Sequence, residues 1–195
     1  ETEPFGKPGE SIRGVRFTGD VAYAVTFLQT DPFYVVDVAD PTAPEVVGEV
    51  ELPGFSSYLH PIGDDHVVGF GPDDMGRASA KLFDVSDPTA PAVVDDLMLG
   101  DEAPVVWDHH AFVALDDGRF AVPATTWSDG PPRSAVVVVD SAGGRLTVDQ
   151  RWGTSIDGTA MRALPSPDGW ALLTGTDLVI LSGDEQVAGT VPLAR

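Results

Sequence analysis

Short apolar segments separated by polar turns recur along the whole chain, and no long segment has the three-to-four-residue spacing of an amphipathic helix. Apolar or alternating runs of about five to eight residues, bounded by Gly, Pro or Asp, are typical of β-strands. The pattern predicts strands at 12–17, 21–28, 33–38, 45–52, 56–62, 66–70, 80–85, 92–99, 108–115, 119–126, 135–140, 145–152, 159–164, 170–174, 177–181 and 186–192.

One eight-residue phrase occurs twice within this pattern. Residues 37–44 read DVADPTAP and residues 84–91 read DVSDPTAP, so the two copies lie 47 residues apart. Apolar strand-forming residues precede and follow both copies. A repeat of about 40–50 residues built from four short strands is typical of a propeller blade. The sequence therefore predicts an all-β protein with the β-propeller fold and about four four-stranded blades.

The repeated phrase contains the residues of a tight turn followed by an edge strand. Asp40 and Asp87 can accept hydrogen bonds from the backbone two residues further on. Pro44 and Pro91 cannot donate a hydrogen bond to a neighbouring strand, so they fit the start of an outermost strand. We therefore interpret the phrase as a hairpin between the two outer strands of a blade.

Proline and glycine clusters divide the chain into a linker at 1–10 and four blades at about 11–53, 54–100, 101–152 and 153–195. Four blades can close a ring, but larger rings are common. The chain begins with Glu1 rather than Met, which is typical of a processed or excised piece. We expect the chain to be part of a larger ring, which a missing N-terminal portion in the same or a separate chain completes.

Composition narrows the classes of partner. The chain has 195 residues and a formal net charge of −20, with 31 acidic and 11 basic side chains. Such a surface repels phosphate backbones, which argues against nucleic acid as a partner. Cysteine is absent, which excludes disulfides and thiolate metal sites. No apolar run reaches the roughly 18–20 residues of a membrane-spanning helix, so no transmembrane segment is expected.

Several motifs carry a family resemblance. Residues 9–13 (GESIR), 31–37 (DPFYVVD), 53–61 (PGFSSYLHP) and 108–112 (DHHAF) resemble bacterial and archaeal secreted proteins with a C-terminal β-propeller distantly related to WD40 repeats. The repeated phrase is also similar to the LVIVD repeats of cell-surface propellers. The resemblance spans roughly residues 6–195 and is strongest over 9–112. It weakens at Gly143 and Gly144, which replace the proline turn in the third blade.

The resemblance implies a secreted or cell-surface location and additional propeller sequence upstream. It implies no reaction. We therefore expect a non-catalytic segment that acts as an interaction platform for a protein, peptide or glycan.

Polar residues on the first strands of the blades are candidates for a binding site. The first strand of a propeller blade borders the central channel, and aligning those strands by their following turns predicts a polar ring there. Convergent polar groups in a concavity are the default hypothesis for a binding site. The binding candidates are Arg13, Arg16, Ser57, His60 and His110, with Ser56 and Met161 or its neighbour at comparable positions.

The alternative function is a metal-dependent enzyme. Asp108, His109 and His110 offer a carboxylate and two imidazoles, which suit Zn²⁺ or another divalent transition metal, and His60 is a possible further ligand. Consecutive residues of a strand point to opposite faces, so His109 and His110 are not expected to face one site without a bulge. The alternative to a metal site is a structural role, in which a histidine forms a hydrogen bond at the interface between two blades and holds them together.

Paired aspartates in turns raise a third possibility. They occur at 64–65, 73–74, 95–96 and 116–117, and carboxylates are ligands of Ca²⁺. None of these turns has the spacing of an EF-hand loop, so solvated turn residues are the favoured interpretation.

Overall fold

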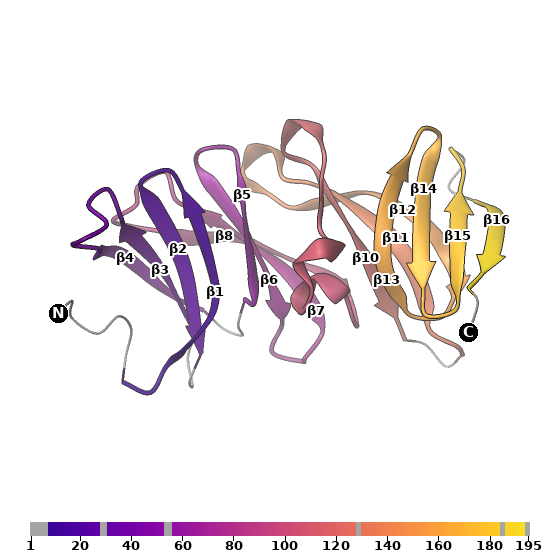
Figure 1. The fold of residues 1–195 in the computed structure, drawn as a ribbon, viewed down its shortest axis with the longest axis horizontal. Helices are drawn as coiled ribbons and strands as arrows, with labels where there is room; N and C mark the ends of the chain where they lie inside the picture. The colour runs from indigo at the N-terminus through magenta and orange to yellow at the C-terminus, as the bar shows by residue number, and fades with distance from the viewer. Residues whose placement is uncertain (1–7, 28–30, 53–55, 128–129, 184–185, 194–195) are drawn as a thin grey trace. The chain divides into compact units, whose positions relative to one another are not determined.

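Four sheets of four strands make up the protein (Figure 1). The computed structural model describes residues 8–27, 31–52, 56–127, 130–183 and 186–193. The four strands of each sheet follow one another in sequence and in space. The predicted all-β propeller fold with four four-stranded blades is thereby confirmed. Residues 1–7 of the predicted linker, Leu28 and the predicted start of the second blade at 53–55 lie outside the described residues.

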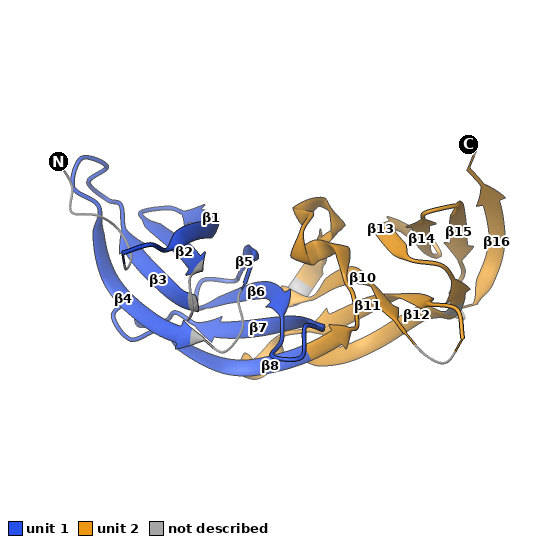
Figure 2. Cartoon of the chain, turned by 90° about the horizontal axis from the view of Figure 1, so that it is seen from below, with its two compact units in different colours: residues 1–97 blue, residues 98–195 orange. Residues whose placement is uncertain are grey.

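The chain divides into two compact units, Glu1–Leu97 and Met98–Arg195 (Figure 2). In the first half of the chain, sheet A contains β1 (Ser11–Thr18), β2 (Val21–Phe27), β3 (Asp31–Asp37) and β4 (Glu45–Leu52). Sheet B contains β5 (Tyr58–Ile62), β6 (His66–Pro72), β7 (Ala78–Asp84) and β8 (Ala92–Gly100), and the boundary between the units falls within β8.

Unit 2 contains the other two sheets. Sheet C contains β9 (Val113–Ala114), β10 (Phe120–Thr126), β11 (Arg133–Asp140) and β12 (Thr147–Asp157). Sheet D contains β13 (Ala160–Ser166), β14 (Gly169–Thr174), β15 (Asp177–Leu181) and β16 (Val187–Pro192). Short 3-10 turns connect them: η1 (Pro104–Val106), η2 (His109–Ala111), η3 (Asp116–Gly118) and η4 (Ala142–Gly144). Among the residues that the structure describes, no helix is long and apolar enough to cross a membrane.

The core of unit 1 lies between sheets A and B. Phe33 of β3 stacks on Phe83 of β7 with ring centroids 4.2 Å apart, and both side chains are fully buried. Tyr23 and Val25 of β2 and Leu59 of β5 join the same cluster. The central strands are apolar on both faces, as expected for sheets that are packed on both sides.

The core of unit 2 lies between sheets C and D. Trp152 of β12 and Trp170 of β14 are buried there, together with Val136, Leu172 and Leu181. Burying large apolar side chains of this kind stabilises a fold by roughly 1.5–3 kcal/mol each.

The first strand of sheet C is the main departure from the predicted strands. Residues 108–115 do not form one strand, because only Val113–Ala114 pairs with β10 and the preceding residues form two 3-10 turns. Pro104 begins the first turn, and its carbonyl accepts hydrogen bonds from the amides of Trp107 and Asp108 at 3.0 and 2.8 Å. Proline favours the first position of a turn because it has no N–H to leave unpaired. This local chemistry overrides the strand preference of the apolar residues that follow.

Candidate functional site

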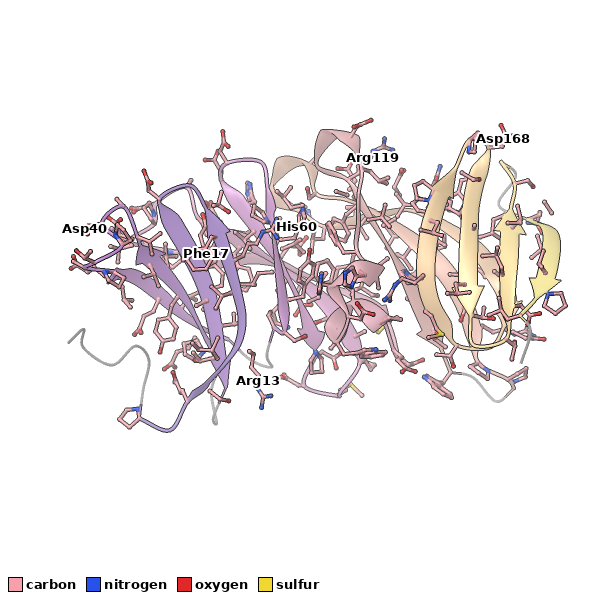
Figure 3. The ribbon with its side chains drawn as sticks, viewed as in Figure 1. Arg13, Phe17, Asp40, His60, Arg119 and Asp168 are labelled. Carbon is pink, nitrogen blue, oxygen red and sulfur yellow. The ribbon has the colours of Figure 1, made fainter. Side chains whose placement is uncertain are left out.

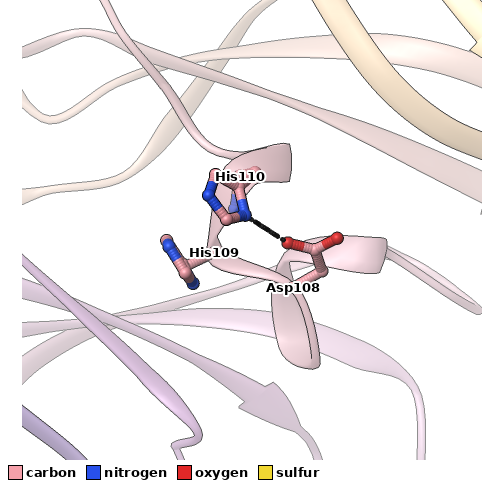
Figure 4. A group of neighbouring side chains, drawn as sticks. All are labelled: Asp108, His109 and His110. Atoms are coloured by element: carbon pink, nitrogen blue, oxygen red, sulfur yellow. Dashed lines mark hydrogen bonds and ion pairs between the residues drawn. The ribbon is translucent and has the colours of Figure 1, made fainter.

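Asp108, His109 and His110 form a compact polar group in unit 2 (Figure 4). Asp108 caps η2: one carboxylate oxygen, Oδ1, accepts from the His110 amide at 3.1 Å and from His110 Nδ1 at 3.0 Å. The rings of His109 and His110 lie with their centroids 3.9 Å apart. Both histidines are exposed, while Asp108 is half-buried.

Arg162 of β13 completes the group from a strand 54 residues further along the chain. Its guanidinium donates to the second carboxylate oxygen of Asp108, Oδ2. This hydrogen bond, followed by those from His110, lowers the pKa of Asp108 to about 2. An ionised carboxylate can only accept, so His110 Nδ1 carries a proton and the lone pair of the neutral ring lies on Nε2.

The expectation that His109 and His110 point to opposite faces is wrong. It assumed a strand, in which consecutive side chains alternate. In a 3-10 turn consecutive side chains are about 120° apart, because the turn has three residues, so two adjacent rings can lie close together. One ligand atom from each of Asp108, His109 and His110 falls within 4.8 Å of the others.

His109 and His110 offer two imidazole nitrogens to a metal ion. Zinc binds imidazole nitrogen at about 2.0–2.1 Å, so the exposed rings would have to rotate inward slightly. His110 already has the arrangement typical of a metal ligand, with its second nitrogen donating to a carboxylate. Asp108 is occupied by His110 and Arg162, so it orients a ligand rather than acting as one. The Arg162 charge next to it disfavours a cation.

A second polar group lies on the first strands of unit 1. His60 and Tyr58 are on β5, with Tyr58 Oη 2.9 Å from His60 Nδ1. Burial, followed by the positive charge of Arg16 on β1, lowers the pKa of His60 to about 4. Burial also raises the pKa of Tyr58. At neutral pH the group therefore offers a neutral imidazole, a phenol and a guanidinium, which suit hydrogen bonding to a polar ligand.

Arg13 and Ser57 are placed differently from this group. Arg13 is exposed near the start of β1, and Figure 3 shows it projecting from the sheet at a distance from His60. The Ser57 amide and hydroxyl both donate to the Phe70 carbonyl, at 2.7 and 3.3 Å. The Ser57 carbonyl lies against Gly14 of β1, where an added Cβ would be only 3.0 Å from the oxygen. Ser57 thus contributes to the contact between β1 and β5.

The remaining predicted candidates are dispersed. Ser56 is buried with no hydrogen-bond partner for its hydroxyl, and Met161 is exposed on β13 next to Arg162. Asp73 pairs with Arg77 at 2.7 Å, and Asp96 pairs with Lys81 at 3.2 Å. The prediction that Asp95 and Asp96 form a turn is wrong, because both residues lie within β8. Within the described ranges, Asp108, His109 and His110 are the one group of three acidic or histidine residues that converges. His60 belongs to unit 1 and is not a member of that group.

Sequence reasoning did not select Tyr58 or Arg162. Tyr58 stands two residues before His60 on β5, so the alternation of a strand places both side chains on the same face. Arg162 is the neighbour of Met161, whose position the strand alignment had marked as comparable to that of His110. Alternation would have found Tyr58 but not Arg162, because a register shift interrupts β13 between Ala160 and Arg162.

Comparison with known proteins identifies the family to which the chain belongs. Residues 2–161 match the family described as beta propeller domain. An uncharacterized protein of Methanocaldococcus jannaschii is 46% identical over 106 residues, 54% of this chain and 17% of that protein. An uncharacterized protein of Archaeoglobus fulgidus is 47% identical over 118 residues, 59% of this chain and 19% of that protein. The matched segment thus covers less than a fifth of the length of either relative.

Proposed function

Since this chain belongs to the beta-propeller domain family, we propose that it supplies blades to a larger, non-catalytic propeller that serves as an interaction platform. Its partners are the remaining blades, in the same or a separate chain, and a protein, peptide or glycan ligand. The exported or cell-envelope location of the platform is supported by the sequence resemblance to secreted and cell-surface propellers.

One observation carries the proposal: among the residues that the structure describes, sheets A and D each present large apolar side chains that are exposed. On sheet D, the strand pairing places Leu164, Ala171 and Ile180 in one row and Leu173, Leu178 and Val191 in another. Leu164 and Val191 are 55% and 56% exposed. On sheet A, Phe17 is 67% exposed. Exposed apolar faces of this kind mark interaction surfaces.

The polar group on the first strands supports the ligand-binding part of the proposal. Arg16, Tyr58 and His60 come from adjacent strands of neighbouring blades, β1 and β5. Functional groups presented by rigid sheets are held in place without the ordering cost that a mobile loop would incur. We infer that a ligand contacts the platform here.

Binding of the hydrophobic dye ANS to the purified chain tests the exposed faces. We expect strong dye fluorescence from the folded chain, because sheets A and D both expose large apolar side chains. The double variant Phe17→Ser/Leu164→Ser should lower it severalfold. The matched control is Met75→Ser, since Met75 is 76% exposed but lies in a turn away from both faces. A monodisperse monomer that binds no dye and unfolds in one cooperative step would contradict the proposal.

The convergence of Asp108, His109 and His110 favours a second candidate function, a divalent transition-metal site of the kind a metal-dependent enzyme uses. His109 and His110 would act as ligands through ring nitrogens, and Asp108 would hold His110 in place. Equilibrium dialysis against Zn²⁺, followed by elemental analysis, measures the stoichiometry. One ion per chain that His110→Ala abolishes and His66→Ala retains would support this candidate. A stoichiometry near zero for the unmodified chain would eliminate it.

A further inference from the structure

The two copies of the repeated turn have the same conformation. In the first copy, the Asp40 carboxylate accepts from the Thr42 amide at 2.9 Å and from the Thr42 hydroxyl at 2.7 Å. In the second, Asp87 accepts from Thr89 at the same two distances. Each turn is also closed by a backbone bond of 3.0 Å from the alanine amide to the aspartate carbonyl. The sequence of the turn therefore sets its shape without help from neighbours.

The second copy of the turn is seated on the preceding sheet. A Cβ added at Gly48 of β4 would lie 2.2 Å from the Pro88 carbonyl oxygen and 2.8 Å from Pro91 Cδ. Gly48 and Pro91 are both buried. The turn of sheet B thus rests on the outer strand of sheet A, at a position where only glycine fits.

The first copy of the turn has the same shape, but no residue that the structure describes covers it. All of residues 40–44 are exposed, including Pro44, the counterpart of the buried Pro91. Asp40 marks this turn in Figure 3. Strand pairing places Phe17, Ala22, Val36 and Val46 in one row across the same sheet. Phe17 and Val46 at the ends of this row are exposed, whereas Ala22 and Val36 between them are buried together with Ala24 and Tyr34.

A second strand glycine in a sequence context like that of Gly48 is Gly189 of β16 in unit 2, and we call this position the glycine seat. Residues 187–191 read VAGTV, and residues 46–50 of β4 read VVGEV. Both strands have a register shift immediately before the glycine, which pairs with Val35 in β4 and with Ile180 in β16. At Gly189, in contrast to Gly48, an added Cβ would meet no atom of the described residues within 4 Å. The apolar row of Leu164, Ala171 and Ile180 ends at this glycine.

We infer that the turn 40–44 of one copy of this chain docks on Gly189 of a second copy, in the way that the turn 87–91 docks on Gly48. This inference rests on the proposed function, in which the terminal sheets require neighbours. The turn and the glycine seat are different surfaces, so the contact is head-to-tail and does not use the seat of one copy or the turn of the other. The exposed side chains of Phe17 and Val46 on sheet A and of Leu164 on sheet D are buried together in the same contact.

Sedimentation velocity of the purified chain over a range of concentrations tests the docking. The measurements use about 0.5 M NaCl, which screens repulsion between chains of net charge −20. Pro44→Glu places a charge on the turn, and Gly189→Val fills the seat. Both positions are exposed or open, so neither change disturbs the fold. Ala39→Glu and Gly130→Val are the matched controls, because both residues are exposed and lie outside the docking surfaces.

We expect each of the two variants to weaken self-association about tenfold or more, which corresponds to about 1.4 kcal/mol. The controls should associate as the unmodified chain does. An equimolar mixture of the two variants should form a dimer and nothing larger, because Gly189→Val retains the turn and Pro44→Glu retains the seat.

Two results would overturn this docking. Self-association that neither variant weakens, with dye binding intact, would refute the turn-and-seat contact while leaving the proposed function standing. A chain that stays monomeric at every concentration would refute it as well, and if that chain also binds no dye, the proposed function fails with it.

Discussion

His60 shows how a propeller blade alters the chemistry of a single residue. It is half-buried between Tyr58 and the Arg16 guanidinium, and both its burial and this positive charge oppose protonation. Its pKa of about 4 lies well below the ordinary value of 6.5. Because the unfolded chain binds the proton more readily, folding stability is fully present above about pH 6.5 and falls as the pH drops towards 4.

We predict that His60→Gln reduces this loss of stability in acid. Between pH 7 and pH 4.5 the unmodified chain should lose about 1–2 kcal/mol through His60, after allowance for solvent screening at a half-exposed site. Urea denaturation followed by circular dichroism at both pH values measures the difference. Equal losses in the variant and the unmodified chain would show that His60 does not titrate in this window.

The sequence identified Asp108, His109 and His110 as a group because they are adjacent, but it did not predict their arrangement. That arrangement depends on the cap that Asp108 provides to a 3-10 turn and on Arg162, which is 54 residues away. Contacts between residues so far apart in sequence depend on the packing of β13 beside η2, which no local pattern contains.

The strands themselves were largely predictable. The predicted strands 45–52 and 177–181 agree with β4 and β15 to the residue, because apolar periodicity and proline or glycine turns mark both ends. The segment 108–115 failed because Pro104 and the Asp108 cap begin turns that the apolar pattern does not reveal. The contact between Gly48 and the turn 87–91 was also missed, since it joins two blades.

Gly48→Ala and Gly189→Ala should differ sharply. At Gly48 the new methyl group collides with the Pro88 carbonyl oxygen, and overpacking of this kind costs about 1–3 kcal/mol. At Gly189 the methyl group meets open space, so the change should stay within about 0.5 kcal/mol. Chemical denaturation of dilute protein, followed by circular dichroism, compares the two.

Tryptophan fluorescence locates the effect of Gly48→Ala within the chain. All four Trp residues lie in residues 98–195, so their fluorescence reports unit 2, whereas circular dichroism reports both units. The stability that Gly48→Ala loses should therefore appear in the unfolding transition followed by circular dichroism. Equal stability of Gly48→Ala and Gly189→Ala would contradict the seating of the turn 87–91 on Gly48.

At the scale of the whole molecule, each of the two units leaves large apolar side chains of one sheet exposed to solvent. Sheet A presents Phe17 and Val46 on one face, and sheet D presents Leu164 and Val191 on one face. The 47-residue repeat predicted blades that need neighbours, but the sequence alone did not show which residues remain uncovered. That distinction requires the structure, in which Phe17 and Val46 are exposed while Ala22 and Val36 of the same row are buried.

Multi-angle light scattering of the purified chain tests the central claim, that these blades require neighbours, most directly. We predict a mass above the 20.5 kDa of one chain at high salt, rising with protein concentration, because copies cover each other's open sheets. A mass of 20.5 kDa at every concentration, from a chain that binds no hydrophobic dye, would contradict the account.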